Sequence, residues 1–360
     1  MAMNGCVRPV AAGLGALAAL VFLMGGTPKA LASCGSAACF MLTGEEGAVQ
    51  GKGKLSVGLQ YAYTISKLAP GVSGLVTSVD QEARQLTLNE HFENRTISEI
   101  ITLDVNYGLT DNFTLEVLVP HKRLEHTHTV EIGNDNNGFG NYEKFSNAGI
   151  GDVRLNGKYS FLPTLRSLVV MGFGVDLPTG DSHATNAAGN LQEPTLQLGR
   201  RSFGIVPSIY QSYEIIPHVL DQFASVSYQH ALTGPNSYRY GDVYVLGGGV
   251  NWKALERVTL TGQFNWRYVV HDEFTGTLAV AQTPHDPGFP GDPIVIDPVA
   301  KRRPVPTTGS TMLAASPGIS VKVRENMRAY FFAQIPVVRD FNGGLIPDVG
   351  FLFGLSMSVN

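Results

Sequence analysis

Residues 56–65 read Ser-Val-Gly-Leu-Gln-Tyr-Ala-Tyr-Thr-Ile, and from Val57 onward every second side chain is apolar. Because successive side chains of a strand point to opposite faces, this stretch predicts a strand with one apolar and one polar face. The same alternation recurs at 101–110 and at 258–271. Many segments of roughly ten residues with this pattern are typical of membrane-spanning β-barrels.

The alternating segments number about twelve, an even number as expected for a single-chain bacterial barrel. They cover residues 54–66, 95–110, 112–130, 147–162, 166–180, 196–215, 219–233, 237–254, 257–273, 310–325, 328–340 and 349–359. Short turns such as 109–112 alternate with long connections such as 66–94. Because bacterial barrels have short periplasmic turns and longer outer loops, we expect an antiparallel transmembrane β-barrel with both termini in the periplasm.

Proline marks the places where this pattern is interrupted. The longest connection, 275–310, contains seven prolines. Proline cannot donate a ladder hydrogen bond, so we expect irregular or polyproline-like backbone there. Such a loop either folds inward as a constriction or covers the rim. Pro207 and Pro317 fall inside predicted strands, where we expect β-bulges.

The N-terminus has the features of an export signal. Arg8 precedes an apolar run at 10–24, and Ala30 and Ala32 place small residues at the two recognition positions. Together these features predict a signal peptide over 1–32, cleaved after Ala32. The run is shorter than the about 20 apolar residues of a membrane helix. Export without a membrane helix leaves a secreted β-sandwich or an outer-membrane protein. We favour the outer membrane of a Gram-negative-type bacterium, with 33–53 as a periplasmic segment and 54–360 as the barrel.

Two of the three cysteines remain after cleavage, since Cys6 lies in the signal peptide. Cys34 and Cys39 are close together in an oxidising compartment, where a disulfide between them is the expected state. Residues 31–34 also read as a lipoprotein box, in which Cys34 would be acylated. We favour the disulfide because Cys39 offers a ready partner.

The composition restricts the partners. Lys and Arg (26) are slightly outnumbered by Asp and Glu (30), so the chain has no basic footprint for nucleic acid. Charged residues are only 16% of the chain, and glycine occurs 41 times, as expected where a lipid-facing band excludes charge. The predicted partners are outer-membrane lipid and a small solute. No cofactor is implied, and the sequence does not determine whether the barrel is a monomer or a homo-oligomer.

If the apolar residues face lipid, the alternate residues line the interior. That set carries charges of both signs, which either line a watery passage or pair with one another. The residues predicted to line the lumen are Asp104, Glu116, Asp152, Arg154, Lys158, Asp176, Gln263, Arg267, Lys322 and Arg324. A hydrated polar interior favours polar or small amphipathic solutes over a purely apolar ligand.

Catalytic and metal chemistry were sought in the same segments. No Gly-x-Ser-x-Gly elbow is present, although a Ser and a His on neighbouring strands could still meet in space. His126 and His128 share one strand face, with His121 nearby. That spacing can supply two metal ligands or can be a solvated strand end. With no third ligand fixed, we predict neither a metal site nor an enzyme.

Two further segments carry a family resemblance. Residues 149–159, Gly-Ile-Gly-Asp-Val-Arg-Leu-Asn-Gly-Lys-Tyr, and 172–181, Gly-Phe-Gly-Val-Asp-Leu-Pro-Thr-Gly-Asp, resemble the paired-strand signature of the outer-membrane barrels named for the meta pathway of phenol degradation. The resemblance implies a channel or transporter for hydrophobic or aromatic compounds. The chain departs from the usual terminal aromatic residue of such barrels, because it ends Met-Ser-Val-Asn at 357–360.

The sequence therefore predicts an outer-membrane channel or transporter for small organic solutes, aromatic or hydrophobic compounds among them. Two alternatives stay open: a barrel enzyme acting on lipid, and a structural barrel that sheathes a partner or captures metal at its rim.

Overall fold

The computed structural model describes residues 49–70, 74–130, 141–161, 164, 166–185, 189–234, 237–281 and 293–359. All described residues belong to one compact unit. The predictions for the signal peptide, Cys34 and Cys39 lie outside the described residues. No helix among the described residues is long and apolar enough to cross a membrane.

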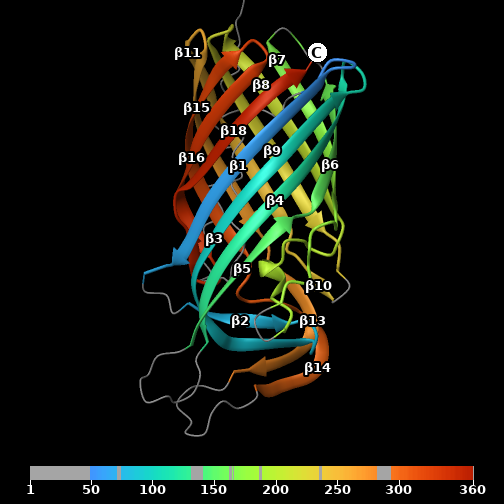
Figure 1. The fold of residues 1–360 in the computed structure, drawn as a ribbon, viewed down its shortest axis with the longest axis vertical. Helices are drawn as coiled ribbons and strands as arrows, with labels where there is room; N and C mark the ends of the chain where they lie inside the picture. Colours follow the sequence, from blue (N-terminus) through green and yellow to red (C-terminus); the bar gives the residue numbers. More distant parts are fainter. Residues whose placement is uncertain are drawn as a thin grey trace, which may run out of the picture. The chain divides into compact units, whose positions relative to one another are not determined.

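Twelve antiparallel strands form a closed barrel, as predicted (Figure 1). Closure comes from the pairing of the first strand with the last, which runs from Leu55 opposite Val359 to Tyr63 opposite Phe351. The wall consists, in order, of β1 (Leu55–Leu68), β3 (Gln85–Gly108), β4 (Phe113–Val130), β6 (Val153–Phe161), β7 (Ser167–Leu177), β8 (Gly204–Ile216), β9 (Leu220–Ala231), β11 (Val243–Leu255), β12 (Val258–Val269), β15 (Ser310–Arg324), β16 (Met327–Phe341) and β18 (Gly350–Val359).

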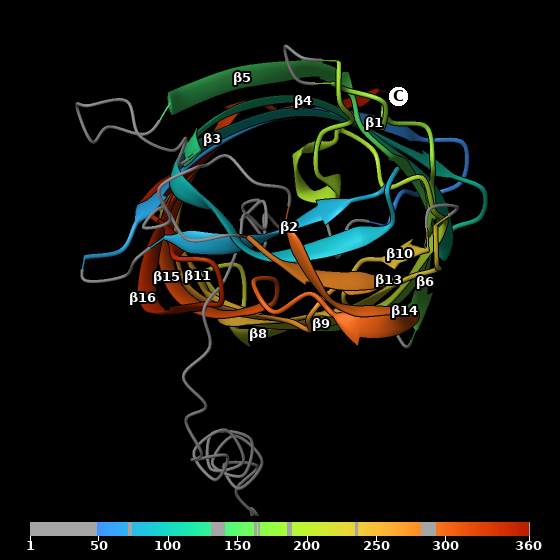
Figure 2. The same ribbon diagram turned by 90° about the horizontal axis from the view of Figure 1, so that it is seen from below.

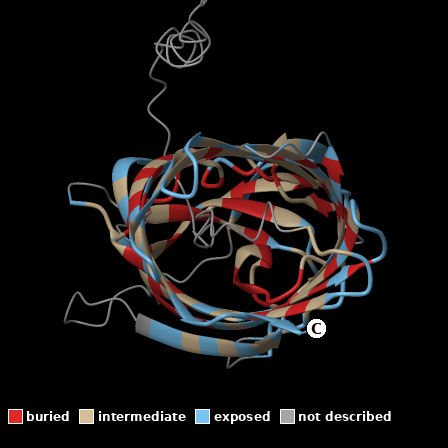
Figure 3. Ribbon diagram, turned by 90° about the horizontal axis from the view of Figure 1, so that it is seen from above, coloured by how far each residue is buried: buried red, intermediate tan, exposed pale blue. Residues whose placement is uncertain are grey.

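The two faces of the wall differ in polarity. Apolar side chains are exposed and polar side chains are buried, which is the opposite of the arrangement in a soluble protein. On β12, Phe264 is 61% exposed, whereas its neighbours Gln263 and Asn265 are 3% and 0% exposed. Leu59, Met171 and Phe353 are likewise exposed, and buried and exposed residues follow one another along the strands of the ring (Figure 3). Apolar side chains thus face outward and polar side chains inward, as in a barrel that has an apolar surrounding.

Short turns lie at one end of the barrel and long connections at the other. The ends of the described barrel, Leu55 and Val359, pair with each other, and Leu55 also pairs with Tyr107 next to the short β3–β4 turn. The first wall strand, β1, therefore begins at the short-turn end, and the last, β18, ends there (Figure 1). The predicted alternation of short and long connections is present in the structure.

The long connections contain strands that the sequence pattern did not reveal. They are β2 (Leu75–Asp80), β5 (Asn141–Ile150), β10 (Tyr238–Arg239), β13 (Glu273–Val280), β14 (Ile294–Pro304) and β17 (Leu345–Pro347). The expectation of irregular backbone through 275–310 is therefore wrong for β13 and β14. Among the described strands β14 pairs only with β13. It is an edge strand, where Pro298 removes no ladder bond of a second neighbour.

The prolines inside the wall also behave differently from the prediction. Pro207 pairs in register with Phe173, and Pro317 with Gly262. On their other sides the ladders skip the proline but resume in the same register. Neither proline therefore forms the expected bulge, because the loss of one donor interrupts a ladder without inserting a residue.

A small sheet covers the long-connection end. We call it the cap and define it as residues 75–88, 237–242, 272–281 and 293–308. Within it β13 pairs in parallel with the start of β3 and antiparallel with β10 and β14. The cap has its own apolar cluster, which consists of Val79, Leu86, Tyr238, Phe274 and Val305. Figure 2 shows β2 and β13 crossing the mouth of the barrel.

A second segment enters the ring itself. Residues 178–203, with 186–188 outside the described part, form what we call the inner loop, and it contains the short 3₁₀ helix η2 (Pro194–Leu196). Figure 2 shows η2 inside the ring of strands. The prediction of a strand from residue 196 is wrong, because β8 begins only at Gly204. The segment that enters the barrel is the inner loop, whereas 275–310 contributes to the cap.

Candidate functional site

Five of the predicted lumen residues are buried: Asp104, Glu116, Lys158, Asp176 and Gln263. Several members of the predicted set are paired with one another. Lys158 Nζ lies 2.5 Å from Glu116 Oε1, and both side chains are 6% exposed. Arg154 Nε lies 2.5 Å from Asp176 Oδ1. Asp104 accepts a hydrogen bond from Asn106 Nδ2 at 2.7 Å, and Gln263 is buried. Along β3, β4, β6 and β7 the interior charges therefore largely neutralise each other.

Asp152 holds the inner loop in place. Its Oδ1 accepts a hydrogen bond from Gly180 N at 3.0 Å, and its Oδ2 accepts one from Arg200 N at 2.8 Å. The two glycines at this point also require close approach, since a Cβ added at Gly180 would lie 2.7 Å from Gly199 Cα. Asp152 thus joins the two ends of the inner loop to the start of β6.

Lys322 and Arg324 lie at the far end of β15 and are exposed there. Lys322 Nζ is 2.5 Å from Glu325 Oε2 in the short β15–β16 turn. These two cations belong to the short-turn rim, and the other predicted lumen cations lie deeper in the barrel.

A cavity that opens to solvent, of about 760 Å³ when the open solvent is included, lies between the wall and the inner loop. Lys122 contributes from β4, Arg267 from β12 and Arg200 from the inner loop. Tyr240 and Asp272 contribute from the cap. The apolar part of the lining comes from Pro194, Leu198, Val243, Val269 and Phe341. The cavity therefore has both a charged and an apolar region, the usual make-up of a small-molecule site.

Hydrogen bonds fix the walls of this cavity. Lys122 Nζ donates to Leu198 O at 2.8 Å, which ties β4 to the inner loop. Tyr240 donates from its hydroxyl to Pro194 O at 2.7 Å, which ties the cap to η2. The Arg200 guanidinium carbon lies 5.4 Å from the centre of the Tyr240 ring, within cation–π range. Three separate elements thus meet at the cavity.

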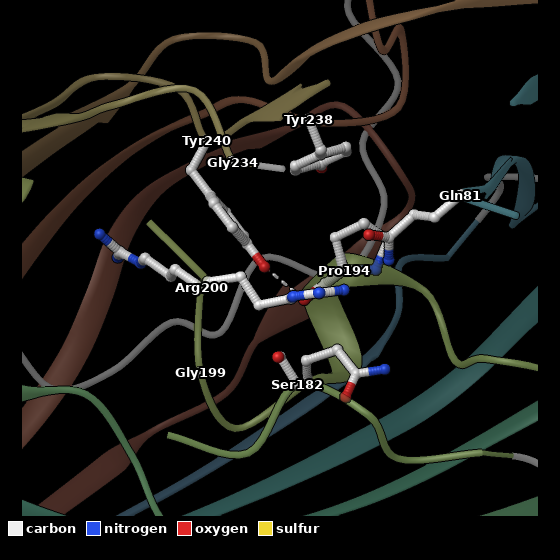
Figure 4. Close-up of a pocket in the computed structure, with 10 residues that line it drawn as sticks. Gln81, Ser182, Pro194, Gly199, Arg200, Gly234, Tyr238 and Tyr240 are labelled. Carbon is white, nitrogen blue, oxygen red and sulfur yellow. Dashed lines mark hydrogen bonds between the residues drawn. The ribbon is translucent and has the colours of Figure 1, made fainter. Parts of the chain in front are cut away.

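A second, smaller cavity shares part of its lining with this one. The second cavity, of about 280 Å³ including its opening, lies between the inner loop and the cap. Pro194, Arg200 and Tyr240 line both cavities. Figure 4 shows the Tyr240 hydroxyl directed at Pro194 with Arg200 beside it, and Gln81 on the opposite side.

Positive charge predominates in the larger cavity. Lys122, Arg200 and Arg267 line it, against one acidic residue, Asp272. Asp272 is already engaged, because it accepts hydrogen bonds from the Tyr238 hydroxyl and from Gly241 N. Burial raises the pKa of Asp272, which weakens its ability to neutralise the cations.

The histidines predicted as weak metal-ligand candidates are split between the two faces of β4. His126 is fully buried, with its Nε2 3.2 Å from Glu93 Oε2 and its Nδ1 2.8 Å from Thr96 Oγ1. His128 Nε2 lies 3.3 Å from Glu143 Oε2. His121 is an odd number of residues away and exposed, so it lies on the opposite face. Within the described part of the chain, no group of three His, Cys, Asp or Glu residues is arranged to hold a metal ion.

Four cavity residues lie outside the predicted lumen set: Lys122, Arg200, Tyr240 and Asp272. Lys122 could have been found, because it has the same strand parity as Glu116 on the predicted strand 112–130. Arg200 was placed in a strand that does not exist there. Tyr240 lies between β10 and β11, and Asp272 between β12 and β13. No periodic signal marks either position.

Comparison with known proteins supports the fold. No family model matches the sequence, and no curated protein sequence matches it. The chain is similar in structure to an outer membrane channel from Pseudomonas putida F1, with a TM-score of 0.56 and 12% identity over 89% of this chain and 100% of that chain. A mutant of the TodX monoaromatic hydrocarbon channel gives a TM-score of 0.46 and 10% identity over 92% and 97% of the two chains. At 12% identity, the likeness to the Pseudomonas putida channel shows a shared barrel fold.

Proposed function

We propose that the protein is an outer-membrane channel for small organic solutes. One observation carries the proposal: the barrel wall is apolar outside and polar inside, with a cavity in its interior. Contact with acyl chains removes an exposed apolar side chain such as Phe264 from water. This stabilises the protein by roughly 25 cal/mol per Å² of apolar surface removed from water. A polar interior, in turn, needs water or a polar solute to satisfy it.

The short-turn end of the barrel, where β1 begins and β18 ends, is proposed to face the periplasm, as in bacterial barrels. The cap would then face outward and meet solutes first. The inner loop would come next along the path of a solute. Asp152 holds this loop through hydrogen bonds from Gly180 and Arg200. Under this proposal solutes pass the cap and the inner loop before they reach the paired charges of β6 and β7.

The proposed solutes are small organic molecules, aromatic compounds among them. The resemblance of 149–159 and 172–181 to the barrels of the meta pathway supports this class. The apolar wall formed by Val243, Val269 and Phe341 supports it as well. Apart from Arg267, which lines the larger cavity, and Asp152, which holds the inner loop, the predicted lumen residues are proposed to keep the interior hydrated rather than to select the solute. Most of those described above are already paired. The proposal assigns no catalytic residue and no cofactor.

Osmotic swelling of proteoliposomes tests the proposal. Purified, folded protein should make liposomes permeable to small polar organic solutes, with a rate that falls as solute size rises. Protein unfolded by heat before reconstitution is the control. Liposomes that swell no faster than this control would contradict the proposed function.

A further inference from the structure

The larger cavity is lined by three cationic side chains and one carboxylate. Among the described residues, no carboxylate forms an ion pair with Arg200 or Arg267. This differs from the rest of the interior, where Arg154 and Lys158 each have a carboxylate partner. A guanidinium shielded from water normally has an anion beside it, since desolvating an unpaired charge is costly.

Burial and the charge of Arg200 both act against the charges of Lys122 and Arg267. Asp152 and Asp176 favour the charge of Lys122, and Asp272 favours that of Arg267. The nearby carboxylates are committed elsewhere. Asp152 accepts from two backbone N–H groups, Asp176 accepts from Arg154 and Gln229, and Asp272 accepts from Tyr238 and Gly241. An anion in the cavity would relieve the repulsion.

The other residues that line the cavity indicate which class of anion it can bind. Leu198, Val243, Val269 and Phe341 give the cavity an apolar side, and Tyr240 adds an aromatic ring. An inorganic anion would use only the charged side. A molecule with a carboxylate at one end and an apolar body at the other would use both, and guanidinium groups pair well with carboxylates.

We propose that this cavity binds a small organic carboxylate, with the carboxylate between Arg200, Arg267 and Lys122 and the apolar body against Val243, Val269 and Phe341. The inference rests on the proposed function, because it names the solute class that the channel takes. It narrows that class from small organic compounds to their acids. Neutral aromatic compounds would be bound more weakly.

Calorimetric titration of the purified protein with sodium benzoate tests this, at fixed ionic strength and neutral pH. Benzyl alcohol serves as the neutral probe of similar size, and inorganic phosphate as the probe without an apolar body. We expect benzoate to bind at least about tenfold more tightly than either. Arg267→Gln and Arg200→Gln should each weaken benzoate binding by at least about tenfold and leave benzyl alcohol unchanged.

Arg257→Gln is the matched control, since Arg257 is exposed in the β11–β12 turn. Retention of the compact, unheated form on gels shows that each variant is folded. Equal binding of benzoate and benzyl alcohol would overturn the inference, as would native-like benzoate binding by both variants or phosphate binding as tight as benzoate.

Conductance in planar bilayers separates this result from the proposed function. A conducting protein that fails to prefer benzoate leaves the channel standing and removes the carboxylate site. A protein that binds benzoate through Arg200 and Arg267 without conducting keeps the site and removes the channel.

Discussion

Arg154 donates two hydrogen bonds to Asp176 across the β6–β7 pair, from Nε to Oδ1 at 2.5 Å and from Nη2 to Oδ2 at 3.1 Å. Gln229 Nε2 donates to the same carboxylate at 2.6 Å. Together these contacts join β6 and β7 to β9, which lies beyond β8, through the barrel interior. They are among the contacts that set the shape of the interior.

Replacing Arg154 by Gln should destabilise the barrel, because it leaves the Asp176 carboxylate buried without its cation. We expect the free energy of unfolding to fall by about 1–3 kcal/mol. Urea unfolding in lipid vesicles, followed by tryptophan fluorescence, measures the loss. Arg154→Gln combined with Asp176→Asn should lose less than the sum of the two single changes, and strict additivity would show that the pair contributes nothing.

The seating of the inner loop should depend on pH through Glu193. Burial raises the pKa of Glu193 from 4.5 to about 7, with Glu93 and Glu90 acting in the same direction and His91 opposing them. A carboxyl group with a raised folded-state pKa stabilises the folded arrangement fully below 4.5 and loses that contribution as the pH rises through 7. The inner loop should therefore be less firmly seated at pH 8 than at pH 5.

Hydrogen exchange of residues 189–200, corrected for the intrinsic rates at each pH, measures this. Native protein should show greater protection at pH 5, and Glu193→Gln should show the same protection at both pH values. Asp181→Asn, which changes an exposed carboxylate of the same loop, should behave like the native protein. An unaltered pH response in Glu193→Gln would rule out Glu193 as the source.

Asp152→Ala should release the inner loop, since it removes both acceptors that hold Gly180 and Arg200. Hydrogen bonds to charged groups contribute about 1.5–3 kcal/mol each, so we expect proteolysis within the loop to accelerate at least about tenfold. Glu256→Ala, at an exposed turn, is the comparison. Cleavage at the native rate would mean that the loop is held by other contacts.

Phe264→Arg tests whether the outer face meets lipid. Phe264 is 61% exposed near the middle of β12. In a bilayer the arginine should cost about 2–4 kcal/mol of folding free energy, whereas on a water-exposed face it would cost almost nothing. Leu255→Arg, at the strand end, should cost about 0–1 kcal/mol. Folding into vesicles under urea titration measures both, and equal small effects would contradict a lipid-facing wall.

The barrel could be predicted from sequence because its signal is local. On β12 the alternation alone assigns Gln263 and Arg267 to the inside and Phe264 to the outside, and no knowledge of the neighbouring strands is needed. The number of wall strands and the rhythm of turns follow from the same pattern.

The cap and the cavity could not be predicted, because they depend on contacts between distant segments. β13 pairs with β3 through Thr277 opposite Gln85, and nothing in either segment specifies the other. Arg200 lines the cavity from the inner loop, and its backbone N–H is held by Asp152 from the start of β6. The charges of the predicted lumen set were visible in the sequence, but which of them are paired became visible only in the structure.

The single-channel conductance of Ser310→Trp in planar bilayers tests the central claim most directly. Ser310 lines the larger cavity, so an indole there should narrow the passage and lower the conductance by at least about twofold. Thr110→Trp, in the exposed β3–β4 turn, should conduct as the native protein does. Native conductance in Ser310→Trp, or no conductance in the native protein itself, would contradict a passage through this cavity.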